Sequence, residues 1–137
     1  MKSYLLDTNC LISFVIERIQ SRTAAISARF ESATNLECEI IVTPHVISEF
    51  VFVLTGVYDR PEQKVHKMIV DLKDTPGIRI DAPYRAETLL DLWPAKIKDY
   101  GDALTAMAAR ELGVPILTFD KHFIKQLKKE GIEYERP

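Results

Sequence analysis

The chain has 137 residues and a formal net charge of −2, which excludes the strongly basic surface of a dedicated DNA-binding domain. Apolar residues make up 47% of the sequence and can close a core without disulfides, so we expect a single domain over residues 1–137. Cys10 and Cys38 stand in no metal-binding or redox spacing, and no apolar run approaches the ~20 residues that span a bilayer. We therefore expect a soluble protein of the reducing cytoplasm, with no membrane partner.

The first half of the chain predicts alternating strands and helices. In chain order these are a strand over 4–6, an apolar helix over 10–16, a helix from about 21 to 35, a strand over 39–43, and helices over 45–55 and 61–74. Pro44 suits the first turn of the helix that follows it, and Gly56 suits its end. The last two of these helices carry more apolar residues than one small core needs, which indicates a dimer or partner surface.

The second half continues the alternation. It predicts a strand over 78–80, a helix over 84–93, an alanine-rich helix over 102–112, a strand over 114–119, a helix over 122–130 and a short edge strand over 133–135. Phe50, Phe52, Leu90, Trp93 and Phe119 fall at positions typical of a core. Strands that alternate with helices favour an α/β fold with a mainly parallel sheet of four to five strands, right-handed crossovers and helices on both faces.

Four carboxylates occupy comparable positions in these elements. Asp7 and Asp120 end predicted strands, Glu49 lies about one turn into a helix that follows a strand, and Asp102 opens a helix. Elements that end or follow parallel strands emerge at one edge of the sheet, so the four side chains can meet in one crevice. Taken alone, Asp7 is better explained as the N-cap of the next helix. The convergence of the other acids is what favours a functional site.

Such a cluster indicates a divalent metal ion. Like charges gathered in one crevice raise one another's pKa values and destabilise the fold, and a divalent cation removes that penalty. Carboxylates without His or Cys at ligand spacing select hard ions, so the sequence predicts Mg²⁺ or Mn²⁺ rather than zinc. These ions leave coordination positions to water and substrate phosphate, as phosphodiester cleavage requires, with one ion or with two held roughly 4 Å apart.

Four motifs follow one another along the chain: Leu6-Asp7-Thr8-Asn9, Ser48-Glu49, Asp102-Ala103-Leu104, and Leu117-Thr118-Phe119-Asp120. In this order they resemble the motifs of the PIN-domain family, and within it the VapC-type toxins of bacterial or archaeal toxin–antitoxin pairs. The resemblance extends from the first element to the last. It implies a three-layer α/β/α PIN-like domain and a Mg²⁺- or Mn²⁺-dependent endoribonuclease.

The resemblance also implies roles for individual residues. Asp7 and Asp102 match the main metal ligands of the family, while Glu49 and Asp120 match residues that complete the cluster or position water. The partners that it implies are an RNA substrate, a small antitoxin whose tail occupies the acidic groove, and a second copy of the toxin in a homodimer. Two polar positions that line such sites are matched by Asn9 and Thr118.

Two residues near these acids have alternative interpretations. Asp99 precedes Asp102 by three positions and either caps the helix or contributes to the site. His45 lies four residues before Glu49 on one helix face, a spacing compatible with joint metal binding, although a polar residue near the helix start explains it better because no third nitrogen ligand is in sight.

Other functions stay open at this point. Lys121, Lys125, Lys128, Lys129 and Arg136 crowd the C-terminus, where they form either a phosphate-facing patch or an ordinary solvated helix face. A PIN nuclease of RNA processing or decay, with no antitoxin, would use the same chemistry. A Mg²⁺-binding phosphotransfer or regulatory domain would instead use the acids at the two strand ends as a phosphoacceptor pocket.

Overall fold

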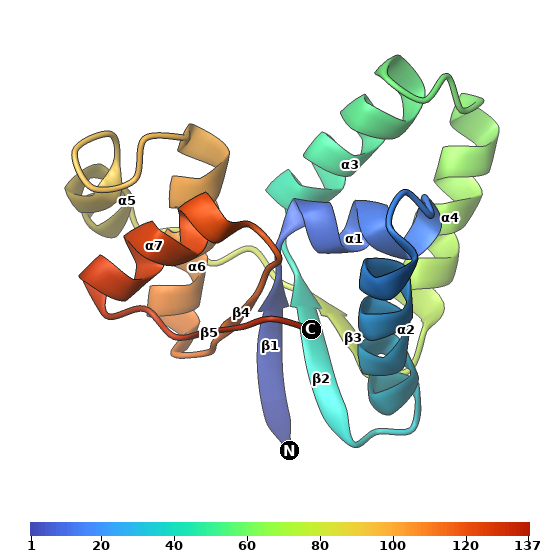
Figure 1. The fold of residues 1–137 in the computed structure, drawn as a ribbon, viewed down its shortest axis with the longest axis horizontal. Helices are drawn as coiled ribbons and strands as arrows, with labels where there is room; N and C mark the ends of the chain where they lie inside the picture. The colour runs from blue at the N-terminus through green and yellow to red at the C-terminus, as the bar shows by residue number, and fades with distance from the viewer.

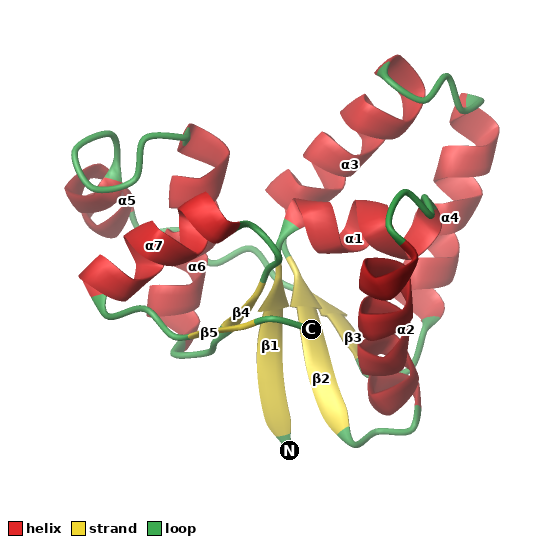
Figure 2. Cartoon of the chain, in the orientation of Figure 1, coloured by secondary structure: helices red, strands yellow, loops and turns green.

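The computed structural model describes residues 1–137 and shows a central sheet with helices on both faces (Figure 1). In Figure 2 the strands, in yellow, lie between the two groups of helices, in red. The strands are β1 (Lys2–Leu6), β2 (Cys38–Val42), β3 (Ile78–Ile80), β4 (Ile116–Leu117) and β5 (Tyr134–Glu135). The helices are α1 (Thr8–Val15), α2 (Gln20–Thr34), α3 (Pro44–Gly56), α4 (Glu62–Asp74), α5 (Ala86–Leu92), α6 (Tyr100–Leu112) and α7 (Lys121–Glu130).

All five strands are parallel, in the order β3-β2-β1-β4-β5. The chain moves outward from β1 through β2 to β3 and later adds β4 and β5 on the other side of β1. The strand order therefore reverses between β1 and β4, and a crevice opens at such a reversal, outside the carboxyl ends of the strands. Leu6 pairs with Leu117 across this boundary, so the residues that follow them, Asp7 and Thr118, emerge side by side.

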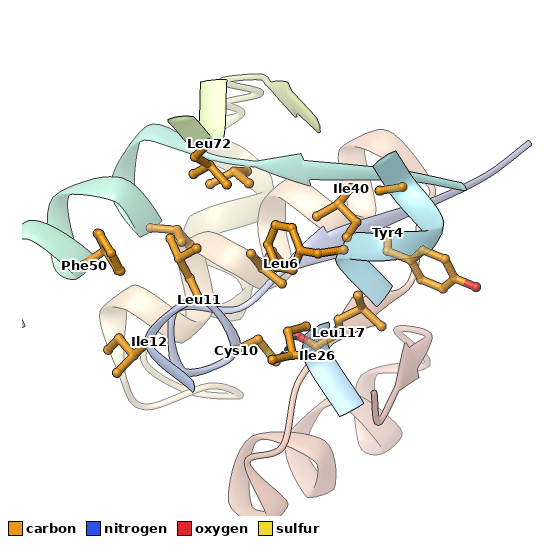
Figure 3. Packing of buried hydrophobic residues seen from close by; sticks show 14 of the residues in the cluster. Tyr4, Leu6, Cys10, Leu11, Ile12, Ile26, Ile40, Phe50, Leu72 and Leu117 are labelled. Carbon is orange, nitrogen blue, oxygen red and sulfur yellow. Dashed lines mark hydrogen bonds between the residues drawn. The ribbon is translucent and has the colours of Figure 1, made fainter. Parts of the chain in front are cut away.

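Alternate residues of the strands feed two cores, because successive strand side chains point to opposite faces of a sheet. Tyr4 and Leu6 belong to the core under α1–α4, whereas Leu5 belongs to the core under α5, α6 and α7. Figure 3 shows the first of these cores, in which Leu6 packs among side chains such as Leu11 and Ile40. With both faces covered, β1 and β4 hold the residues at their ends in fixed positions.

The predicted α/β fold with a parallel sheet is confirmed, and every predicted strand and helix is present with shifted ends. The strand expected over 114–119 is the shortest relative to its prediction. Val114 is not part of β4, because the N–H of Val114 donates a hydrogen bond to Ala109 O at 3.2 Å in the turn that ends α6. None of the helices has both the length and the apolar character needed to cross a membrane.

Two core assignments were wrong. Phe52 is 73% exposed and Leu90 is 66% exposed. In α3 the buried residues Val46, Phe50 and Leu54 recur every four positions, which places residue 52 on the opposite side of the helix. Because α3 is apolar on nearly all sides, its sequence does not indicate which face is buried.

Candidate active site

Asp7 is the first residue after β1 and is only 4% exposed. It is the N-cap of α1: its Oδ1 accepts a hydrogen bond from the backbone N–H of Thr8 at 2.9 Å. Its Oδ2 accepts a hydrogen bond from the hydroxyl of Thr118 at 2.8 Å. The capping role is therefore real, and it coexists with a place at the carboxyl edge of the sheet. Two hydrogen bonds fix the carboxylate and leave a lone pair on each oxygen.

Asp120 caps the helix that leaves the neighbouring strand. Its Oδ1 accepts hydrogen bonds from the backbone N–H groups of His122 at 2.9 Å and Phe123 at 3.1 Å, at the start of α7. Its own N–H donates to Thr118 Oγ1 at 3.1 Å. Thr118, which is fully buried, thus links Asp7 to Asp120 and sets the spacing of the two strand ends.

A second pair of acids comes from the start of α6. Asp99 is the N-cap, and its Oδ1 accepts a hydrogen bond from the N–H of Asp102 at 2.8 Å. Asp102 therefore lies in the first turn of α6. We had expected Asp102 to open the helix, but Asp99 holds that position. A methyl group placed on Gly101 would lie 2.9 Å from Glu49 Oε1 and 3.2 Å from Asp99 Oδ1. The bare glycine lets α3 approach α6 and brings Glu49 over the same turn.

The electrostatics of Asp102 show that these acids face one space. Burial, and then the charges of Asp7, Asp99, Asp120 and Glu49, raise the pKa of Asp102 to about 8. All four residues that the sequence placed at the site are therefore brought together, and Asp99 joins them while also capping α6. We call these five residues, Asp7, Glu49, Asp99, Asp102 and Asp120, the acidic site.

The other members respond in the same direction. Burial raises the pKa of Asp7 to about 6, with the charges of Asp120 and Glu49 adding to the effect and its two hydrogen bonds opposing it. Burial and the charge of Asp99 also raise the pKa of Glu49. A folded chain that gathers carboxylates in this way stores unfavourable charge repulsion, and functional sites are where such pKa shifts concentrate.

Cations of the chain do not offset this charge. No Lys or Arg lies within ion-pair distance of the acidic site, and the one basic neighbour is His45, whose Nε2 is 3.9 Å from Glu49 Oε1. Burial lowers the pKa of His45 below its ordinary value, so its ring is neutral at pH 7 and supplies no counter-charge.

The donor set fits a hard divalent ion. The side chains form no ready-made cage of three or more His, Cys, Asp or Glu ligands. Mg²⁺ does not need one, because it commonly takes one or two carboxylates and keeps several waters. Carboxylate oxygens with free lone pairs, mutual repulsion and no cationic partner meet that requirement.

His45 has a structural role in holding α3 against α6. Its Nδ1 lies 3.0 Å from Thr43 Oγ1, and its Nε2 lies 2.9 Å from Thr105 Oγ1. With both ring nitrogens engaged by hydroxyl groups, His45 is a positioning residue for its helix neighbour Glu49. Thr105 was not predicted as a functional residue, because it is a buried polar residue in an otherwise apolar stripe of α6. Asn9, the other polar candidate, is exposed in the first turn of α1 and forms no hydrogen bond with the acidic site.

A doubly wound parallel sheet with uncompensated carboxylates at its switch point defines an α/β domain whose candidate site lies at the strand ends. The chain belongs to the PIN domain family, whose model matches residues 4–129, from β1 to α7. The family suggested by the four motifs is thereby confirmed.

Comparison with curated proteins gives no match. Among solved structures, the chain is similar to the crystal structure of Mycobacterium tuberculosis VapC20, a sarcin–ricin loop cleaving toxin. The TM-score is 0.69 and the sequence identity 16%, over 98% of this chain and 99% of that one. At this identity the likeness concerns the fold, and it agrees with the predicted three-layer α/β/α arrangement.

Proposed function

We propose that the protein is a divalent-metal-dependent endoribonuclease and that the acidic site is its catalytic centre. The observation that carries the proposal is Asp102, whose pKa is raised to about 8 by burial and by four neighbouring carboxylates, with no Lys or Arg to balance them. Membership of the PIN domain family and the fold shared with an RNA-cleaving toxin support the same chemistry.

Each acid has a distinct task in this proposal. Asp7 and Asp102 are the main ligands for Mg²⁺ or Mn²⁺, Asp120 and Glu49 complete the shell or orient the attacking water, and Asp99 holds the first turn of α6. When bound, the metal ion supplies charge neutralisation for the phosphate and lowers the pKa of the attacking water. Thr118 keeps the carboxylate of Asp7 turned toward the crevice.

Two protein partners complete the proposal. An apolar cavity of about 400 Å³ lies among α1, α2, α3 and α4, and it supports an antitoxin segment as the regulatory partner. Exposed apolar side chains on and after α3, Phe52 and Val57, support contact with a second copy of the chain. A nuclease of RNA processing or decay would need no antitoxin, so induced expression of the protein separates the two roles: a toxin arrests growth and its Asp102→Asn variant does not.

The test of the activity is cleavage of a structured RNA pool by the purified chain with Mg²⁺, with Mn²⁺ and with EDTA. We expect cleavage with either metal and none with EDTA. Asp7→Asn and Asp102→Asn should abolish it, because an amide cannot replace a carboxylate as a ligand to a hard cation. Circular dichroism should show that both variants keep the fold, since each substitution removes charge repulsion.

Asp59→Asn is the matched control. Asp59 is exposed, has a positive φ of 51° that asparagine also adopts, and lies in the loop between α3 and α4. This variant should cleave as the native chain does. Full activity of the Asp102→Asn variant, or equal cleavage in EDTA, would contradict the assignment. An acid-stable aspartyl-phosphate adduct after incubation with acetyl phosphate would point to phosphotransfer instead.

A further inference from the structure

A hollow of about 550 Å³ between α7 and the C-terminal segment is lined by cations and by no carboxylate. Its basic residues are Lys121, Lys125 and Lys128 from α7 and Arg136 from the segment after β5. None of these four side chains lies within ion-pair distance of an acid, whereas Lys96 and Arg110 both pair with Asp91. We call this surface the basic hollow.

The sequence builds the hollow from two periodicities. The three lysines recur at i, i+4 and i+7, which places them on one face of α7. In β5 and the residue that follows it, Tyr134 and Arg136 share one side, and Glu135 points to the other, because strand side chains alternate. Glu135 bonds instead with Lys2 at 2.5 Å and with Arg29 at 3.1 Å. Glu135 is therefore turned away from Arg136 and is already paired with other cations.

The basic hollow begins where the acidic site ends. Asp120, a member of that site, is the N-cap of α7, and Lys121 is the first residue of the helix. In Figure 1, α7 starts beside the carboxyl end of β1 and runs outward from it. Lys121 and Lys128 are separated by roughly 10 Å along the helix axis, so the three lysines present a row of positive charges and not a single one. The three lysines of α7 thus follow a line that leads away from the acids, and Arg136 lines the same hollow.

The carboxylates of the acidic site repel a polyanion, and the cations of the basic hollow can offset this repulsion. A positively charged groove combined with an aromatic side chain is the usual surface for single-stranded nucleic acid. Tyr134 supplies the aromatic ring, and the Lys128 ammonium lies 5.9 Å from its centre. An acidic protein segment would match the charge but not the continuity with a phosphodiester-cleaving centre.

We propose that the basic hollow binds the phosphate backbone of single-stranded RNA on one side of the scissile bond. The proposal rests on the nuclease function and names the surface that holds its substrate. Lys121, Lys125, Lys128 and Arg136 contact phosphates, and they bind RNA without regard to sequence because phosphates are alike at every base. The acidic site cuts the strand, and the hollow keeps it in place.

The experiment measures binding without cleavage. The full chain carrying Asp102→Asn is titrated into a short fluorescein-labelled oligouridine, and the fluorescence anisotropy is followed at several KCl concentrations. Against this background, Lys125→Glu and Arg136→Glu reverse one charge each in the hollow. Lys64→Glu reverses the charge of a cation on α4 that has no acidic partner. In Figure 1, α4 and α7 lie on opposite sides of the sheet. Circular dichroism verifies the fold of each variant.

We expect Lys125→Glu and Arg136→Glu each to weaken binding about tenfold and to reduce the slope of log K against log[salt] by ~0.7 per lost phosphate contact. Lys64→Glu should leave both unchanged. Three outcomes would overturn the proposal: hollow variants that bind as the Lys64→Glu control does, no binding at low salt, or equal binding of poly-glutamate. Failure of the nuclease function would show differently, as absence of metal-dependent cleavage by the native chain, whatever the anisotropy.

Discussion

The hydroxyl of Thr118 donates a hydrogen bond to Asp7 Oδ2 at 2.8 Å, joining residues that are 111 positions apart in the sequence. Thr118 Oγ1 in turn accepts a hydrogen bond from the N–H of Asp120 at 3.1 Å. One buried hydroxyl group therefore positions two acids from neighbouring strands, and it also stabilises the charged form of Asp7, because a donor to a carboxylate lowers its pKa.

Thr118→Val should weaken metal binding without unfolding the chain. The variant leaves Asp7 Oδ2 and the N–H of Asp120 unpaired in a buried place, which costs about 1–3 kcal/mol of stability. It also raises the pKa of Asp7, so protons compete better with the metal. We expect Mn²⁺ affinity, measured by calorimetry, to fall more steeply between pH 7.5 and 5.5 than in the native chain. Thr118→Ser keeps the hydroxyl and should restore the native pH profile; a common profile for all three proteins would remove Thr118 from this role.

The metal-free chain should lose stability as the pH rises. In the folded state the pKa of Asp7 is raised to about 6 and that of Asp102 to about 8, both from ordinary values near 3.8. The folded state therefore binds more protons than the unfolded state between about pH 4 and pH 8, and the free energy of unfolding decreases across that window. Urea titrations in EDTA at several pH values measure this decrease.

Asp102→Asn tests the cause of that pH dependence. The variant carries no charge at this position, so its stability should fall less with pH and should exceed that of the native chain at pH 8. Asp59→Asn, which lies outside the acidic site, should keep the native slope. Parallel slopes for all three proteins would mean that repulsion in the acidic site does not set the pH dependence.

Divalent ions should reverse this loss. A ligand that binds only the folded state at about 100 times its Kd adds ~2.7 kcal/mol, which corresponds to about 5–10 °C in Tm for a chain of this size. We expect Mg²⁺ and Mn²⁺ to raise Tm at pH 8 by this amount and to raise it much less at pH 5, where Asp7 and Asp102 are protonated. KCl at equal ionic strength should have little effect. If Mg²⁺ or Mn²⁺ raised the Tm of the Asp102→Asn variant by the same amount, the ion would bind at another site.

The acids at strand ends were predictable because parallel strands must deliver the residues after them to one edge. Asp7 and Asp120 follow from that geometry. The role of Asp99 was not decidable, because two acids three residues apart both suit a helix start, and only the bond to the N–H of Asp102 shows which one caps. The structure shows that Asp99 caps α6 and that its charge also acts on Asp102.

Contacts between α3 and α6 had no local signal. His45 and Thr105 are 60 positions apart, and their bond depends on how two helices pack on the sheet. The effect of Gly101 on Glu49 likewise appears only when both helices are in place. Residues that act across elements are those that a single sequence conceals.

Gly101→Ala should reduce RNA cleavage without reducing the stability of the fold. Alanine favours a helix by about 1 kcal/mol over glycine, and the α6 backbone at this position needs no left-handed conformation, so the stability of the chain should hold or rise. The added methyl group would lie 2.9 Å from Glu49 Oε1 and must displace that carboxylate. We expect RNA cleavage to fall at least about tenfold while Tm is unchanged or higher, because the displaced acid no longer completes the site.

Gly56→Ala, where a methyl group meets nothing within 4 Å, is the control and should affect neither quantity by more than a small amount. A Gly101→Ala protein with native activity would show that Glu49 can move without loss of cleavage. Glu49 would then leave the proposed catalytic residues, and three aspartates would remain to hold the metal: Asp7, Asp102 and Asp120.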